Sequence, residues 1–233
     1  MTAAPRQLAL RFPPRRQCTL ESFEAGANPE LVARLAATDG ARFTLIWVTG
    51  AAGAGKSHLL QAACEATARS GGTAAYLPAD LATDAATVVD GLEAMDRVAL
   101  DDAPAWLGEQ SREAALLGLY QGLAERHASL IVAAAVGPRA IEFALPDLAS
   151  RMRAAETLAI EPLDDAARRR LAHRIAASRG FTLADDALAY LLNTGPRGSG
   201  ELVAALEALD AASLAAQRRV TIPLIRSVLR AIA

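Results

Sequence analysis

Eight consecutive residues, GAAGAGKS at positions 50–57, have the types and spacing needed to hold a phosphate group. They follow an apolar run over residues 43–48 and precede a helical pattern over residues 57–69. A G-x-x-x-x-G-K-S/T segment between a strand and a helix turns its backbone N–H groups toward phosphate oxygens, and the helix adds the positive end of its dipole. The alternative is a chance match in a turn rich in alanine and glycine. The flanking elements favour a site for a nucleoside triphosphate or diphosphate.

Each residue type in this loop has a chemical use. The glycines allow a tight turn, because they lack the Cβ atom that restricts other residues. Lys56 supplies a positive charge for the β- and γ-phosphates, and Ser57 supplies a hydroxyl for Mg²⁺. We assign the contacts with the nucleotide to the residues of the loop and the one that follows it, namely Gly50, Gly53, Gly55, Lys56, Ser57 and His58.

A second candidate is the pair Asp101 and Asp102, which ends an apolar strand over residues 98–102. In a protein with a phosphate loop, the first acid can hold the Mg²⁺ shell through water, and the second can orient or deprotonate an attacking water. Adjacent acids at a strand end also serve as caps or as solvated turn residues. Their position downstream of the loop favours the metal role for Asp101 and the catalytic role for Asp102.

A third candidate is the N-terminal segment over residues 7–12, which has the sequence QLALRF. In an extended chain its apolar side chains lie on one side, because successive side chains point in opposite directions. The segment is either a short edge strand that packs on its own domain or a linear peptide that binds an apolar pocket of another protein. In the second interpretation the contact residues are Gln7, Leu8, Leu10 and Phe12.

The composition of the 233 residues excludes several classes of protein. Apolar residues make up 52%, which is too many for a disordered chain, and the net charge of −2 gives no basic field for nucleic acid. Cys18 and Cys64 are far apart and have no metal-like spacing, as expected in a reducing cytosol. No signal peptide and no membrane span are recognisable, and we expect a cytoplasmic protein.

The order of the elements predicts an α/β domain followed by helices. Apolar strands and helical patterns alternate up to Pro162, which implies a parallel sheet with right-handed crossovers. After Pro162 only helical patterns follow, and an arginine-rich run over residues 168–174 is expected to face solvent. We divide the chain into an irregular tail, a nucleotide-binding α/β domain and a helical lid, over residues 1–18, 19–162 and 163–233.

The phosphate loop, the two acids and the helical lid resemble the AAA+ ATPases. The segment TLESF at residues 19–23, with Gly26 and Asn28, is similar to the part of the DnaA branch that packs on adenine. Residues 145–151 and 216–223 are similar to the Hda family of DnaA-related regulatory inactivators. This resemblance covers nearly the whole chain. It implies a five-stranded parallel P-loop AAA+ sheet with helices on both faces and a small C-terminal helical lid, and it assigns Phe23 and Asn28 to the nucleotide.

The resemblance also implies a function in the regulation of replication initiation. Residues 7–12 are similar to the peptide by which that family binds the sliding clamp, the β subunit of DNA polymerase III. Bound to ADP or ATP with Mg²⁺, such a regulator promotes hydrolysis of the ATP that DnaA carries. Arg151 would be the arginine finger that enters the active site of DnaA. The alternative is an ordinary surface contact between Arg151 and Asp147, one helical turn earlier. A homo-oligomer is left open, and no sequence-specific DNA binding and no DNA-binding domain are expected.

Two departures from the AAA+ pattern predict weak hydrolysis by the chain itself. The strand over residues 130–135 ends in alanines where the family has a polar sensor, and Gly200 stands where the lid has a sensor arginine. Arg197, three residues earlier, is the candidate replacement because it would lie on nearly the same helix face. The alternatives to a regulator are an autonomous P-loop ATPase or kinase that acts on a small molecule, and a loader-type ATPase.

Overall fold

The computed structural model describes residues 18–37, 40–81 and 84–232. The residues assigned to a clamp-binding peptide, Gln7, Leu8, Leu10 and Phe12, therefore lie outside the described residues. No helix in these ranges is long and apolar enough to cross a membrane.

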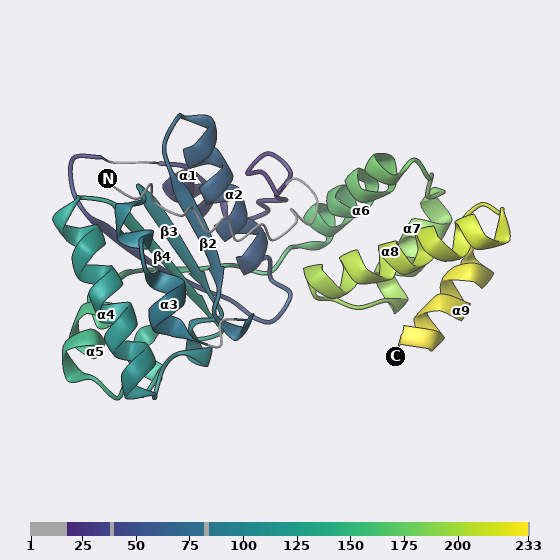
Figure 1. Cartoon of the computed structure of the whole chain (residues 1–233). Helices are drawn as coiled ribbons and strands as arrows, with labels where there is room; N and C mark the ends of the chain where they lie inside the picture. Colours follow the sequence, from purple (N-terminus) through teal and green to yellow (C-terminus); the bar gives the residue numbers. More distant parts are fainter. Residues whose placement is uncertain (1–17, 38–39, 82–83, 233) are drawn as a thin grey trace, which may run out of the picture.

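Five parallel strands form one sheet in the order β2-β3-β4-β1-β5 (Figure 1). This confirms the predicted parallel five-stranded sheet, with strand ends within one or two residues of the apolar runs in the sequence. The strand that leads into the phosphate loop, β1, lies between β4 and β5, and Val48 pairs with Ala133 on one side and Leu158 on the other. The bounds of the strands are Thr44–Thr49 (β1), Ala74–Pro78 (β2), Arg97–Asp101 (β3), Ser129–Ala134 (β4) and Glu156–Ala159 (β5).

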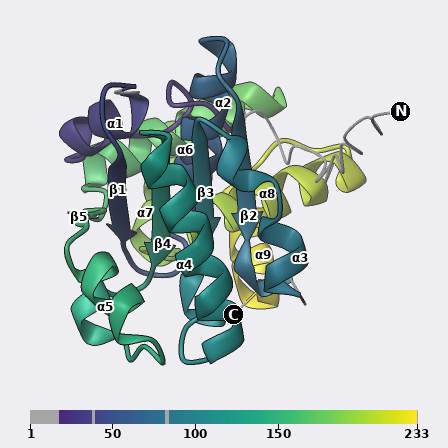
Figure 2. The same cartoon turned by 60° about the vertical axis from the view of Figure 1, so that its left-hand side comes forward.

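Helices cover both faces of this sheet, as predicted. Along β1 the side chains alternate: Ile46 and Val48 pack with α1 and α2, whereas Trp47 packs in the cluster under α3, α4 and α5. Figure 2 shows α3 and α4 in front of the strands. The bounds of these helices are Pro29–Ala36 (α1), Lys56–Arg69 (α2), Ala85–Val89 (α3), Gln110–Glu125 (α4) and Pro146–Arg153 (α5).

Four single-turn 3₁₀ helices complete the sheet domain, over Ala79–Leu81 (η1), Leu92–Ala94 (η2), Ala103–Ala105 (η3) and Pro138–Ala140 (η4). Helix α3 ends at Val89, because Gly91 shortly after it takes a φ of +82° that a helix cannot contain.

The lid consists of four helices beside the sheet domain (Figure 1), over Asp165–Arg179 (α6), Asp185–Thr194 (α7), Ser199–Ala216 (α8) and Ile222–Ile232 (α9). Asp164 caps α6 by accepting from the amide of Ala167, and Gly180 ends the helix with a φ of +76°. The lid has an apolar core of its own, which includes Leu188, Leu206 and Ile225.

The arginine run on α6 faces solvent at Arg169 and Arg170, but the prediction is wrong for Arg168. The side chain of Arg168 is 4% exposed and donates to the carbonyl oxygens of Leu192 and Pro196 near the end of α7. Arg170 and Arg174 both form ion pairs with Glu24. Charge alone suggested a solvated face, but carbonyl groups at a helix end and a carboxylate of another segment supply partners.

One buried cation joins the two helices on the α1–α2 face to β3. The Arg97 guanidinium donates to the carbonyl oxygens of Leu35 and Ala63, both at 2.9 Å, and to that of Ala37 at 2.6 Å. Burial lowers the pKa of Arg97. Cations are favourable near helix C-termini, so carbonyl groups take the place of a carboxylate partner here.

Replacement of Arg97 by alanine should lower the free energy of unfolding by about 3 kcal/mol, because it leaves a cavity and removes the hydrogen bonds to three carbonyl groups. Urea unfolding followed by circular dichroism measures this change. The exposed Arg139, replaced in the same way, is the control and should leave the midpoint unchanged. Equal urea midpoints for the two variants would contradict the interpretation that Arg97 holds α1 and α2 against β3.

Candidate nucleotide site

The phosphate loop over residues 50–57 links β1 to α2, and two of its glycines are required by the backbone. Gly53 and Gly55 have φ values of +71° and +102°, which other residues rarely adopt. Space at Gly55 is also closed, because a Cβ atom there would lie 2.8 Å from Cε2 of Phe23. The Phe23 ring therefore rests directly on the turn of the loop.

The ammonium group of Lys56 lies over the loop itself. Its Nζ donates to the carbonyl oxygen of Gly50 at 2.7 Å and to that of Ala51 at 2.9 Å. Ser57 follows in the first turn of α2, where its side chain is exposed. The positive charge and the hydroxyl thus lie beside the loop that would receive the phosphates, as the motif predicts.

Asp101 and Asp102 end β3 in different environments. Asp101 is 7% exposed, and its Oδ1 accepts from the backbone N–H of Asp102 at 3.0 Å. Its Oδ2 accepts from the hydroxyl of Tyr76 at 2.7 Å. Asp102 is exposed and takes a φ of +52°. The buried acid is therefore held in place while the second acid faces solvent.

His58 holds the segment over residues 19–28 against α2. Its Nε2 lies 3.0 Å from the carbonyl oxygen of Thr19 and 3.1 Å from Oγ of Ser22, and its ring lies against that of Phe23 with centroids 5.6 Å apart. Burial lowers the pKa of His58, and the positive charge of Arg174 lowers it further. The imidazole is thus occupied with positioning Phe23.

Asn28 ties the same segment to the chain between β5 and the lid. It stands at the N-cap position of α1 but makes no capping hydrogen bond. Instead, its amide nitrogen donates to the carbonyl oxygens of Ala25 and Glu161, and its oxygen accepts from the N–H of Glu161 at 2.7 Å. The side chain of Asn28 therefore joins two segments of the chain instead of capping the helix.

The start of α8 in the lid touches the phosphate loop through one side chain and through backbone atoms. Ser199 Oγ donates to the carbonyl oxygen of Gly53 at 2.9 Å, and a Cβ atom on Gly200 would lie 2.6 Å from Cα of Gly53. An arginine at position 200 has no room in this arrangement. The argument that placed Arg197 on the same helix face is wrong, because α8 begins at Ser199 and the exposed Arg197 precedes it.

Arg151 is the predicted site residue that the structure does not bring to the loop. It lies on α5, on the side of the sheet domain away from the lid (Figure 1). Its Nε is 3.2 Å from Oδ1 of Asp147, and its guanidinium carbon is 5.0 Å from the centre of the Tyr120 ring. The surface pair with Asp147 does form, but the Arg151 side chain is still 35% exposed.

Glu113 is a buried carboxylate that sequence reasoning missed, and it anchors the start of α5. Glu113 on α4 is fully buried and accepts from the backbone N–H groups of Gly108, Ala144 and Leu145 at 2.7 to 2.9 Å. The last two residues immediately precede α5. The signal in the sequence was a glutamate three residues before the buried Leu116, on the apolar face of its helix.

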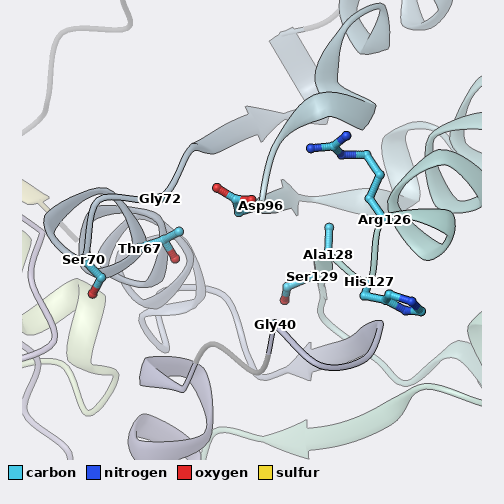
Figure 3. Close-up of a pocket in the computed structure, with 9 residues that line it drawn as sticks. All are labelled: Gly40, Thr67, Ser70, Gly72, Asp96, Arg126, His127, Ala128 and Ser129. Atoms are coloured by element: carbon cyan, nitrogen blue, oxygen red, sulfur yellow. The ribbon is translucent and has the colours of Figure 1, made fainter.

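The pocket in Figure 3 belongs to a different part of the sheet. Its volume is about 280 Å³, and it lies at the amino ends of β3 and β4, whereas the phosphate loop follows the carboxyl end of β1. Asp96 in this pocket accepts from the N–H and hydroxyl of Thr73. Among the described residues, Oγ of the buried Ser129 has no hydrogen-bond partner. The pocket is therefore separate from the loop and its neighbours.

Ser57 and Asp101 fit a magnesium ion only together with a nucleotide. In the described part of the chain, no group of three or more His, Cys, Asp or Glu side chains could hold a metal ion. Mg²⁺ commonly takes one or two protein oxygens and completes its shell with water and substrate phosphates. One hydroxyl and one carboxylate beside a phosphate loop match that donor set.

Comparisons with solved structures show which proteins share the fold of this chain. The domain III structure of the Thermotoga maritima replication initiation protein DnaA superposes with a TM-score of 0.79 at 17% identity, over 92% of this chain and 96% of that one. AMPPCP-bound DnaA from Aquifex aeolicus gives 0.69 at 22%, over 82% of this chain and 64% of that one. The RuvB Holliday junction branch migration motor from Thermotoga maritima gives 0.60 at 11%, over 81% of this chain and 61% of that one. The fold is that of the AAA+ proteins.

A comparison with protein-family models adds information on the lid. Residues 164–229 match the family model described as the lid domain of Hda. The lid is therefore similar to that of Hda, and the chain as a whole shares the fold of the DnaA structures. The chain spans just under two thirds of the length of the Aquifex DnaA chain.

Replacement of Gly200 by alanine should separate α8 from the phosphate loop, because the new methyl group would overlap the backbone of Gly53. Amide hydrogens of residues 50–57 should then exchange faster, which hydrogen–deuterium exchange with mass spectrometry measures. Loss of helix stability cannot explain such a result, since alanine favours a helix more than glycine does. At Gly198 the nearest atom to a new Cβ is a flexible Glu201 carboxylate oxygen, so Gly198→Ala is the control. Unchanged exchange in Gly200→Ala would show that the contact does not hold the lid.

Proposed function

We propose that this chain is a nucleotide-bound regulator of chromosome replication initiation that binds the sliding clamp and promotes hydrolysis of DnaA-bound ATP. The observation that carries the proposal is the Hda-type lid over residues 164–229 on a DnaA-like AAA+ fold with a complete phosphate loop. The regulator and its target would then share one architecture, which allows the two to pack as neighbouring AAA+ subunits do.

The nucleotide is ADP or ATP, held between the loop, the segment over residues 19–28 and the start of α8. Relatives with this fold bind AMPPCP, an ATP analogue. Gly50, Gly53 and Gly55 shape the loop, and Lys56 provides the charge. Phe23 and its supports, His58 and Asn28, form the adenine side of the site in this proposal. Arg197 precedes α8 and remains a candidate for contact with the phosphates from the lid.

Ser57 and Asp101 would hold Mg²⁺ together with the phosphates, and the ion would neutralise part of the phosphate charge. Asp102, exposed at the end of β3, is the group proposed to orient an attacking water. The next strand in the sheet ends in Ala133 and Ala134, both fully buried and apolar. No polar side chain of β4 can therefore assist Asp102 from that position. Hydrolysis by this chain itself should be slow.

Arg151 is the proposed arginine finger for the ATP of DnaA. Asp147 is itself more than half exposed, so the pair between them is a weak surface contact that a phosphate group can replace. The anchor that Glu113 gives to the start of α5 would hold the finger at a fixed place. Helix α5, which carries Arg151, lies on the side of the sheet domain away from the lid that the loop contacts, which favours a head-to-tail contact between subunits. The same contact would also allow a homo-oligomer.

Arg151→Ala should remove the stimulation of DnaA, because an arginine finger typically contributes about 10³–10⁵ in rate. The assay contains DnaA, ATP, clamp-loaded DNA and the purified protein, and it measures phosphate release. Affinity for ADP, measured separately, should not change. Arg153→Ala is the matched control, since this exposed arginine on the same helix lies over Phe143. Full stimulation by Arg151→Ala would refute the finger assignment, and no stimulation by the unmodified protein would refute the proposed function.

The clamp contact is assigned to Gln7, Leu8, Leu10 and Phe12 on sequence grounds. Joint replacement of Gln7, Leu10 and Phe12 by alanine should abolish binding to the β subunit of DNA polymerase III, measured by surface plasmon resonance, because it removes the apolar anchors and the orienting amide. Arg16→Ala in the same tail is the control. If the triple variant binds the clamp as well as the unmodified protein does, the peptide is not the contact.

A further inference from the structure

A tyrosine that none of the preceding assignments uses lies at the proposed metal position. Tyr76 is on β2, and its neighbour in the sheet, β3, carries Asp101 two residues beyond the partner of Tyr76. The Tyr76 hydroxyl reaches along the strand and donates to Oδ2 of Asp101 at 2.7 Å. Since Oδ1 accepts from the N–H of Asp102, both oxygens of this buried carboxylate have a donor from the protein itself.

The same hydroxyl also lies beside α2. Burial raises the pKa of Tyr76, whereas the side chains of Gln61 and Ser57, one helical turn apart, lie close enough to the hydroxyl to lower that pKa slightly. The phenol is the donor in the bond to Asp101, because an ionised carboxylate can only accept. Tyr76 thus connects the two groups that the phosphate-loop pattern assigns to magnesium, Ser57 and Asp101.

We propose that Tyr76 determines the metal requirement of the nucleotide site: by satisfying Asp101, it allows the chain to hold a nucleoside diphosphate with little dependence on Mg²⁺. This inference rests on the nucleotide binding proposed above. Without the phenol, a carboxylate that is 7% exposed would face the phosphates with one oxygen lacking a donor. Repulsion between these negative groups would then have to be relieved by the cation. With the phenol, the donor is present whether or not the cation is bound.

The strength of the hydrogen bond between Tyr76 and Asp101 sets the expected change in nucleotide affinity. A hydrogen bond to a charged group contributes more than one between neutral groups, and its loss at a buried carboxylate changes an equilibrium by about tenfold or more. Because the hydroxyl matters most where no cation balances Asp101, its removal should weaken binding without Mg²⁺ far more than binding with Mg²⁺. The ratio of the two dissociation constants isolates this effect from any general loss of affinity.

The test compares the full chain with Tyr76→Phe, which keeps the ring and removes only the hydroxyl. After removal of bound nucleotide, a fluorescent ADP analogue is titrated in buffer with Mg²⁺ and in buffer with EDTA. For the unmodified protein, the dissociation constant should rise by no more than about threefold in EDTA, whereas for Tyr76→Phe this ratio should be larger by about tenfold. Equal ratios for the two proteins would overturn the inference.

Two further variants make the test specific. Tyr190→Phe is the matched control, because the Tyr190 hydroxyl lies on the lid and contacts Arg226, and the ratio should be unchanged. In an Asp101→Asn background, Tyr76→Phe should no longer alter the ratio, since the negative charge that the phenol satisfies is gone. A persistent effect in that background would overturn the link to Asp101. Absence of ADP binding in both buffers would instead refute the proposed nucleotide site, and the inference with it.

Discussion

The backbone of the lid lies directly on the backbone of the phosphate loop, at Gly200 and Gly53, with no side chain between them. This close approach sets the position of α8 and therefore constrains how the whole lid sits on the sheet domain. A second connection runs through the segment over residues 19–28, which His58 holds to α2 and which Glu24 joins to α6 by ion pairs. The loop itself touches both connections, since Gly53 lies against Gly200 and Gly55 lies against Phe23. The position of the lid therefore depends on the shape of the loop.

Sequence reasoning could predict the sheet and the loop because both depend on local patterns. An apolar run followed by a glycine-rich turn and a helix has one common structural solution, and the alternation of strands and helices fixes the parallel arrangement. The partnership of Tyr76 with Asp101 could not be predicted in this way. It depends on the register between β2 and β3 and on the reach of one side chain along the strand. The contact of Gly200 with Gly53 likewise requires the relative position of two distant segments.

Three buried charged residues escaped the sequence analysis, one of them in the α6 run that was expected to face solvent, and they share one physical cause. Composition assigns arginines and glutamates to solvent, yet Arg97, Arg168 and Glu113 are buried in this fold. In each case the partners include backbone groups, the carbonyl oxygens at helix ends for the arginines and the N–H groups before α5 for the glutamate. Backbone groups carry no sequence signature, so such burial becomes visible only once the elements are placed. All three residues are hydrogen-bonded to partners in other elements, and these hydrogen bonds explain why a buried charge is tolerated.

The phosphate loop and the proposed arginine finger need different surroundings, and the two lie on different parts of the fold. The loop needs close backbone contact and partners for a buried carboxylate, which Gly53, Gly200 and Tyr76 supply. A finger needs exposure and a fixed base, which α5 offers to Arg151 through Glu113. Apolar alanines end β4 where hydrolysis would require a polar group, so the groups around the loop are better suited to retaining a nucleotide than to cleaving it. In the proposed function, the nucleotide of this chain would then serve to fix the lid, while the chemistry would occur at the phosphate loop of DnaA.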